Sequence, residues 1–457
     1  MNSKLRIQRA KLGLLAIVIL LFGVAGVIGQ SDGSQQNKTG RGGTFAIVGA
    51  RIVTVSGSVI ENGTVVIQNG KITAVGTGVS VPSGAERIDG KGLSVYPGMI
   101  DASTNLGLAE VGQGANATID VQEVGSMNAN AKAITGINPH SSHVNVTRVN
   151  GITTVLSEPS GGTISGQSAL INLNGSTQAE MAVDPVHSLV INFPRVTGGG
   201  GFGGGGFGGG GGGPQLDFNE LVRRRDAAVE ELKKMFREVE AYARSVEAYA
   251  KDKTMPTPAT SLRFDAMIPY VRGQKAIHFT VERERDIRAV AKFVAEMKVK
   301  GVIVGGQEAW KAADELKKNN IAVIYTNIYS LPVQEDDPFD YLYAAPSLMQ
   351  KAGVKFAIST GEGGGNVRDL PYQAGMAGAY GLGREEALKS VTLYPAQILG
   401  VDDKLGSIEV GKMANVVVAD GDILDARTNV KYVFIGGRMV PLTSRHTELF
   451  DSFKDRK

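Results

Sequence analysis

Cysteine is absent from the sequence of 457 residues. The chain therefore has no disulfide framework, no thiolate nucleophile and no zinc site built on cysteine. Histidine is scarce, with five residues in the whole chain. Any metal site that relies on imidazole ligands must draw on this small set.

An excess of charge is also missing, because the formal net charge is only +3. Four basic residues lie before residue 12, namely Lys4, Arg6, Arg9 and Lys11. Residues 1–29 contain no acidic residue, so without them the formal charge falls from +3 to −1. Net charge thus gives no support to a nucleic-acid surface, and we expect no nucleic-acid partner.

The N-terminal segment joins this basic stretch to an uncharged apolar run over residues 12–29. That layout is typical of an export signal, and the run is also long enough for a membrane anchor. We expect residues 1–29 to be one or the other, with membrane contact only through this segment. The protein is then periplasmic or extracellular, or tethered by an uncleaved anchor. Residues 30–43 are rich in Ser, Gly, Gln and Asn and predict a flexible tether.

The hydrophobic pattern of the chain changes near residue 95. Before it, short strand-like runs are separated by turn signals such as Asn69-Gly70, which indicates a hairpin. After it, short apolar runs alternate with helical stretches, which favours a parallel sheet or a barrel. Strand-like runs return at 415–419 and 430–435. We expect the β segments of the two chain ends to pair in one small sandwich.

Five regions of the chain resemble the amidohydrolase superfamily, in the order found in that family. Pro97–Gly107 resembles its first barrel strand, in which Pro-Gly-hydrophobe-Ile-Asp leads into His-x-His. The N-terminal region resembles imidazolonepropionase-like members in particular. The regions besides Pro97–Gly107 are 49–53 with 69–76, 151–155, 386–396 and 406–415.

The resemblance implies an α/β fold: a (β/α)8 TIM-like barrel with a small β-sandwich domain formed from both chain ends. The sandwich takes residues 44–94 and 406–445, and the barrel takes residues 95–405. Two insertions interrupt the barrel, a glycine-rich stretch at 198–213 and a long amphipathic helix at 216–250. The helix is expected to pack on the barrel or to form a homo-oligomer.

The family's chemistry rests on one or two metal ions that activate water at the carboxyl ends of the barrel strands. Here Ser103 and Asn105 stand at the two His-x-His positions. Gly305-Gly306 stands where a sixth-strand histidine is expected, whereas His278 matches the fifth-strand histidine. The resemblance therefore implies either one divalent metal, zinc or iron, with His278 among its ligands, or no metal.

Other candidate site residues lie near expected strand ends. Glu158 and Glu362 are the candidate catalytic carboxylates, and Asp101 is expected mainly to orient its strand. The candidate substrate-binding residues are Ser103, Asn105, Gly161 and Gly162. The last two belong to a glycine-rich turn after Glu158, which either presents backbone donors to a ligand or is a plain turn.

Two functions follow from this pattern. The first is a hydrolase that acts on non-peptide carbon–nitrogen bonds of a small cyclic or linear amide-like substrate. The second is a catalytically inactive, metal-free barrel that binds a small molecule or acts as a partner subunit. Bound metal, and its loss when His278 is replaced, would discriminate between them.

Overall fold

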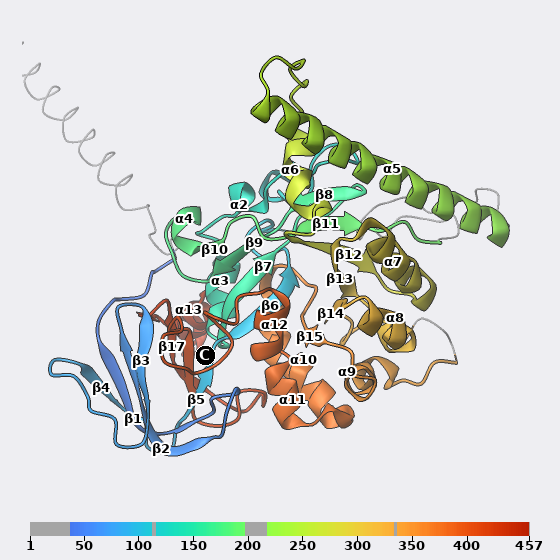
Figure 1. Cartoon of the computed structure of the whole chain (residues 1–457). Helices are drawn as coiled ribbons and strands as arrows, with labels where there is room; N and C mark the ends of the chain where they lie inside the picture. The colour runs from blue at the N-terminus through green and yellow to red at the C-terminus, as the bar shows by residue number, and fades with distance from the viewer. Residues whose placement is uncertain (1–36, 112–115, 197–216, 333–335, 457) are drawn as a thin grey trace, which may run out of the picture.

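The computed structural model describes residues 37–111, 116–196, 217–332 and 336–456. It shows a mixed α/β fold, as expected, with strands arranged in three sheets (Figure 1). The N-terminal segment 1–29, residues 30–36 of the expected tether and the glycine-rich insertion 198–213 lie outside the described residues. None of the helices within the described ranges combines the length and apolar character that a membrane span requires.

One eight-stranded sheet joins the two ends of the described chain, in the order β18-β17-β16-β5-β1-β2-β3 with β4 beside β1. Its strands are β1 (Phe45–Ile52), β2 (Ile60–Gln68), β3 (Lys71–Gly76), β4 (Glu86–Asp89), β5 (Ser94–Pro97), β16 (Val416–Ala419), β17 (Val430–Ile435) and β18 (Arg438–Val440). Asn69 and Gly70 both have positive φ in the β2–β3 turn, as a tight hairpin requires. The arrangement as a sandwich stays a prediction.

Two further sheets make up the α/β body. The four-stranded sheet has the order β10-β9-β7-β6, and the six-stranded sheet has the order β15-β14-β13-β12-β11-β8. Their strands are β6 (Met99–Thr104), β7 (Ile152–Ser157), β8 (Ile164–Gln167), β9 (Ala169–Asn172), β10 (Ala182–Asp184), β11 (Leu189–Asn192), β12 (Ala276–Val281), β13 (Lys300–Gly305), β14 (Ala322–Tyr325) and β15 (Phe356–Ile358). β6 and β7 are parallel, and so are β11 to β15. Closure into one eight-stranded barrel stays a prediction.

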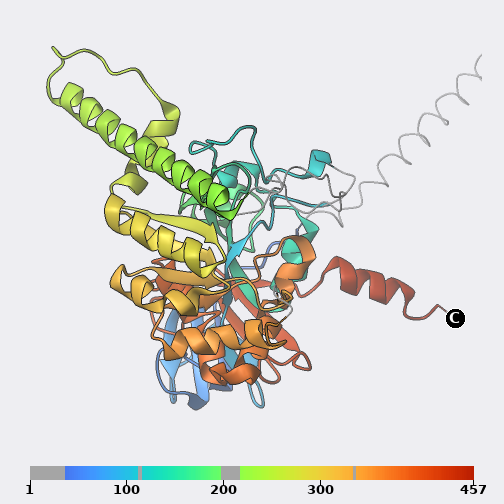
Figure 2. The same cartoon turned by 90° about the vertical axis from the view of Figure 1, so that its right-hand side faces the viewer.

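Helices follow most of the parallel strands and cover the six-stranded sheet (Figure 1). They are α2 (Ala133–Gly136), α3 (Ser142–Arg148), α4 (Gln178–Met181), α5 (Phe218–Lys251), α6 (Leu262–Val271), α7 (Glu284–Met297), α8 (Ala313–Lys318), α9 (Tyr341–Lys351), α10 (Leu370–Ala377), α11 (Arg384–Lys389), α12 (Leu393–Ile398) and α13 (Arg445–Phe453). The long helix expected over 216–250 is α5. Figure 2 shows α5 lying along one end of the body and α13 extending away from it.

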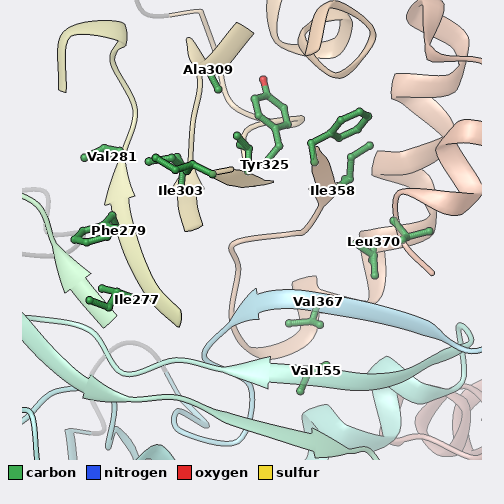
Figure 3. Close-up of a cluster of buried hydrophobic side chains, with 14 of the residues drawn as sticks. Val155, Ile277, Phe279, Val281, Ile303, Ala309, Tyr325, Ile358, Val367 and Leu370 are labelled. Atoms are coloured by element: carbon green, nitrogen blue, oxygen red, sulfur yellow. The ribbon is translucent and has the colours of Figure 1, made fainter. Parts of the chain in front are cut away.

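The main core lies between the six-stranded sheet and its helices. Ile277, Phe279 and Val281 of β12 belong to this core and alternate with the polar positions of the same strand (Figure 3). The Phe279 ring meets Phe293 of α7 edge-on at 5.7 Å, and Phe293 meets Phe236 of α5 at 5.1 Å. This aromatic packing fixes β12 against α7 and α5, so the opposite face of β12 is held in a defined position.

A second buried cluster includes side chains from both sheets of the body, among them Leu156 of β7, Val302 of β13 and Ile324 of β14. The two sheets thus share buried apolar side chains. Residues 37–41 of the expected tether also contact the folded part of the chain. Asn37 Nδ2 donates to Ser141 O at 3.2 Å, and Arg41 pairs with Glu86 at 2.6 Å.

Candidate functional site

Three of the candidate residues are brought together although they are far apart in the sequence. Ser103 lies near the end of β6, Glu158 directly follows β7, and His278 lies in β12. Ser103 Oγ donates to Glu158 Oε2 at 2.6 Å, and His278 Nδ1 lies 2.6 Å from Glu158 Oε1. All three side chains are buried. Glu158 therefore holds a serine and an imidazole, one on each carboxylate oxygen.

His278 is fully buried and occupies the third position of β12, three residues before the strand ends at Val281. Its Nε2 atom has no hydrogen-bond partner in the part of the chain that the structure describes. The His187 ring lies 6.2 Å away, and His187 Nε2 bonds to Leu399 O at 2.9 Å. Burial and the neighbouring His278 lower the pKa of His187.

Asp101 of β6 is fully buried in a cage of donors. The Ser359 hydroxyl donates to Oδ1, and Thr360 Oγ1 donates to Oδ2 at 2.5 Å. The Ser103 and Thr360 backbone N–H groups add contacts of 3.3–3.4 Å. Burial nevertheless raises the pKa of Asp101 to about 6. Both carboxylate oxygens are engaged, which agrees with a role in holding β6 in place.

The other candidate residues lie apart from the Ser103–Glu158–His278 contacts. Glu362 is exposed, and its backbone carbonyl accepts a bond from Thr104 Oγ1 at 2.6 Å. Asn105 Oδ1 is buried without a partner among the described residues, and a Cβ on Gly363 would lie 2.8 Å from Asn105 Cγ. The assigned roles of Glu362 and Asn105 stay predictions.

The glycine-rich turn after Glu158 packs closely on the loop at 122–126. A Cβ on Gly161 would overlap the Gln122 side chain, and one on Gly162 would lie 2.9 Å from Gly125 O. Both glycines also have positive φ, which disfavours any other residue there. Loop packing and backbone conformation account for both glycines, and their role in substrate binding stays a prediction.

The sequence reasoning missed a carboxylate at the end of β12. Glu282 directly follows the strand and is partly buried. Its Oε2 accepts bonds from Gln307 N at 3.1 Å and from Asn327 Nδ2 at 2.8 Å. Burial raises the pKa of Glu282 to about 7, although Arg195 and Arg283 lie near enough to oppose that rise. Glu282 thus lies at the edge where active sites form in α/β folds.

Gly305 at the end of β13 makes room for this carboxylate. A Cβ on Gly305 would lie 2.7 Å from Glu282 Cδ, and φ at this position is +98°. The residue expected here from the family pattern is histidine. A histidine would collide with Glu282 in its present position, so the glycine and the glutamate form a matched pair.

These residues do not fit a family-type metal ion. No group of three or more histidine, aspartate or glutamate residues is placed to hold an ion anywhere in the described ranges. His278 Nε2 has no partner among the described residues, but Glu158 already accepts bonds on both oxygens. Serine, amide and glycine at the remaining positions supply poor ligands or none for zinc or iron.

Comparison with known proteins supports the family resemblance. The model of the amidohydrolase family matches residues 229–440. A dihydroorotase from Geobacter metallireducens is 40% identical over 60 residues, which cover 13% of this chain and 14% of the relative. A putative N-acetylgalactosamine-6-phosphate deacetylase from Escherichia coli is 30% identical over 99 residues, 22% of this chain and 56% of the relative. The matches span less than two thirds of either relative.

The fold is similar to solved structures over most of the chain. An amidohydrolase from Thermotoga maritima matches with a TM-score of 0.74 at 24% identity, covering 88% of this chain and all of the other. A prolidase solved with N-methylphosphonate-L-proline matches with a TM-score of 0.52 at 18% identity, covering 87% of this chain and 99% of the other. At these identities the likeness concerns the fold alone.

Proposed function

Since this chain belongs to the amidohydrolase superfamily, as a divergent member without the His-x-His pair, we propose that it hydrolyses a non-peptide carbon–nitrogen bond. The substrate is a small cyclic or linear amide-like molecule. Glu282 is the residue that handles the proton. The proposal extends the family's reaction class to a site whose polar groups differ from those of the family pattern.

The observation that supports this proposal most strongly is the position and protonation of Glu282. A pKa of about 7 lets the carboxyl group both take up and give back a proton at neutral pH. Gln307 N and Asn327 Nδ2 fix Oε2, which leaves Oε1 as the reactive oxygen. A carboxyl group in this state at the carboxyl end of a parallel strand is well placed for acid–base catalysis.

The proton path is simple. Glu282 Oε1 takes a proton from water as the water oxygen bonds to the carbonyl carbon of the substrate. The carbon–nitrogen bond then breaks, and the same proton passes from Glu282 to the leaving nitrogen. The products are a carboxylic acid and an amine, and Glu282 returns to its starting state.

Arg195 suggests which amide-like substrates to test first. Its exposed guanidinium follows β11 and lies near enough to Glu282 to act on its pKa. A cation beside the reactive carboxylate suits a substrate that carries its own anionic group. Dihydroorotate and N-acetylated amino-sugar phosphates have this chemistry, and the matched relatives bear the names of enzymes for such molecules.

The test is a hydrolysis assay of the full chain, extracted in mild detergent, on dihydroorotate, N-acetylglucosamine 6-phosphate and uncharged cyclic amides. Turnover should fall at least about 100-fold in Glu282→Gln. Glu315→Gln, which alters a partly exposed glutamate on α8 that pairs with Arg288, is the control and should retain full turnover. Equal turnover in Glu282→Gln and Glu315→Gln would refute the assigned role of Glu282.

The buried contacts of Glu158 and Asp101 favour a second candidate, a metal-free domain that binds a small molecule without turnover. Each oxygen of both carboxylates already accepts a hydrogen bond from a protein donor, which disfavours the binding of a water or a metal there. Binding without hydrolysis in titration calorimetry, lost in Arg195→Ala, would select this second function.

Localisation and self-association belong to the same proposal. We propose export to the periplasm or the extracellular space, or tethering through residues 1–29, because of the basic stretch and the apolar run that follows it. The outer face of α5 is mostly exposed and offers a surface for a homo-oligomer. Cell fractionation would test the localisation. Sedimentation of a variant altered on the outer face of α5 would test the self-association.

A further inference from the structure

We infer that a hydrogen-bonded network of side chains replaces a bound ion in joining the two sheets of the α/β body. We call it the cross-sheet network. Its members are Asp101, Ser103, Glu158, His278, Ser359 and Thr360. The inference goes beyond the proposed function, because it concerns how the site region is held together and not which reaction it performs.

The first arm of the cross-sheet network runs through Glu158. Ser103 belongs to β6 and Glu158 follows β7, both in the four-stranded sheet, whereas His278 belongs to β12 of the six-stranded sheet. The two bonds on Glu158 are 2.6 Å each and lie in a buried setting. A carboxylate that bonds an imidazole in a region of low dielectric makes a strong and directional link.

The second arm runs through Asp101. Its strand, β6, has no backbone ladder with β15 in the described part of the chain, because the two strands belong to different sheets. Ser359 and Thr360, directly after β15, donate their hydroxyls to the two oxygens of Asp101. Ser359 Oγ also accepts from Ser103 N at 2.9 Å, so the two arms meet at β6. Gly361 N adds one backbone bond to Ser103 O at 3.2 Å, and side chains make the rest of this junction.

An ion would compete with these contacts for the same atoms. To bind it, Glu158 and Asp101 would have to share oxygens that already accept bonds, or Glu158 would have to release Ser103 or His278 and Asp101 would have to release Ser359 or Thr360. Each release leaves a buried polar group without a partner, which is costly. The sixth-strand position is closed as well, because Glu282 fills the space beside Gly305. The buried carboxylates therefore favour hydrogen bonds within the protein over a bound metal.

The inference predicts a folded protein whose stability does not depend on metal. The full chain, purified in mild detergent after growth with added zinc and iron, should contain far less than one equivalent of either metal by elemental analysis. Its thermal unfolding midpoint should be the same in EDTA as in excess zinc. One equivalent of zinc or iron, or a midpoint that EDTA lowers, would overturn the inference, even if every variant failed to fold.

Two substitutions test the network itself. Ser103→Ala and His278→Ala should each lower the unfolding midpoint, and the double variant should lose less than the sum, because both act through Glu158. His278→Asn, whose amide nitrogen lies where Nδ1 does and keeps the donor to Glu158, should recover part of the loss. His446→Ala on the surface is the matched control. If His278→Ala unfolds at the same midpoint as His446→Ala, the network carries no structural weight.

These outcomes are distinct from those of the proposed function. A metal-free chain that hydrolyses none of the tested substrates would count against the hydrolase and leave the cross-sheet network intact. A chain with stoichiometric metal and Glu282-dependent turnover would support the hydrolase and count against the cross-sheet network.

Discussion

Asp101 lies within β6 and Glu282 directly follows β12, and burial raises the pKa of each carboxyl group, to about 6 and about 7. They differ in what their oxygens do. Both oxygens of Asp101 accept bonds from Ser359 and Thr360, and the side chain is fully buried. Glu282 is partly buried, and its two side-chain bonds fall on Oε2.

The comparison shows that a raised pKa does not by itself mark a reactive group. Buried structural carboxylates and catalytic ones share the same cause, the loss of hydration of the charged form. What separates the two is that the side-chain bonds of Glu282 fall on one oxygen, whereas those of Asp101 engage both. On this criterion Asp101 is structural and Glu282 is the candidate for chemistry.

The largest effect on stability is expected from Asp101→Ala. The change leaves the hydroxyls of Ser359 and Thr360 buried without their acceptor and cuts the junction between β6 and β15. We expect a loss of about 3–5 kcal/mol in the free energy of unfolding, measured by urea denaturation. A loss below about 1 kcal/mol would show that Asp101 does not hold the sheets together.

Glu282→Gln tests the other half of the comparison, the carboxyl group to which we assign the chemistry. The amide keeps the bonds to Gln307 and Asn327 in part and cannot carry a proton to a leaving group. Turnover should fall by about 100-fold or more while the free energy of unfolding changes by less than about 1 kcal/mol. A large loss of stability with little loss of turnover would reverse the roles assigned to Asp101 and Glu282.

The pH dependence of stability should sharpen the comparison. Each group has a higher pKa folded than unfolded, so between the two values the folded state binds more protons and stability falls as pH rises. For Asp101 the fall should occur from pH of about 4 to 6 and amount to about 2–3 kcal/mol. For Glu282 it should continue to about pH 7 and be smaller, because water screens a partly exposed group.

Urea denaturation at a series of pH values checks this expectation. Asp101→Asn should remove the lower part of the fall, and Glu282→Gln should remove the upper part. The pH profile of turnover should have its midpoint near pH 7, and this midpoint should depend on Glu282 alone. Stability that rises between pH 4 and 7 would contradict the sign for both groups.

The sequence predicted the framework better than the site. Five short regions identified the superfamily, and the model of the amidohydrolase family matches residues 229–440. Strand-ending turns such as Asn69-Gly70 depend on local backbone rules, so they can be read from the sequence. The partners Glu158 and His278 were both noted as candidates, but their mutual contact depends on a tertiary approach across 120 residues.

Glu282 was missed for a physical reason. It opens the charged run Glu282-Arg283-Glu284-Arg285-Asp286, which has the appearance of a solvated helix start. Only the fold shows that Glu282 lies over Gly305 and next to Asn327. Gly305 in turn was interpreted as a lost histidine, whereas the structure shows that it provides space for the carboxylate. The sequence indicates the Glu282–Gly305 pair only through a glutamate that directly follows an expected strand.

The smallest effect is expected from Gly305→Ala, and it tests the glycine–glutamate pair directly. The added methyl group would contact the Glu282 carboxylate, and φ of +98° disfavours alanine, so stability should fall by about 1–2 kcal/mol. Because Glu282 must move, turnover should fall as well. In the Glu282→Gln background the change should affect stability but not turnover. If Gly305→Ala leaves wild-type turnover intact, the position of Glu282 beside Gly305 does not matter for catalysis.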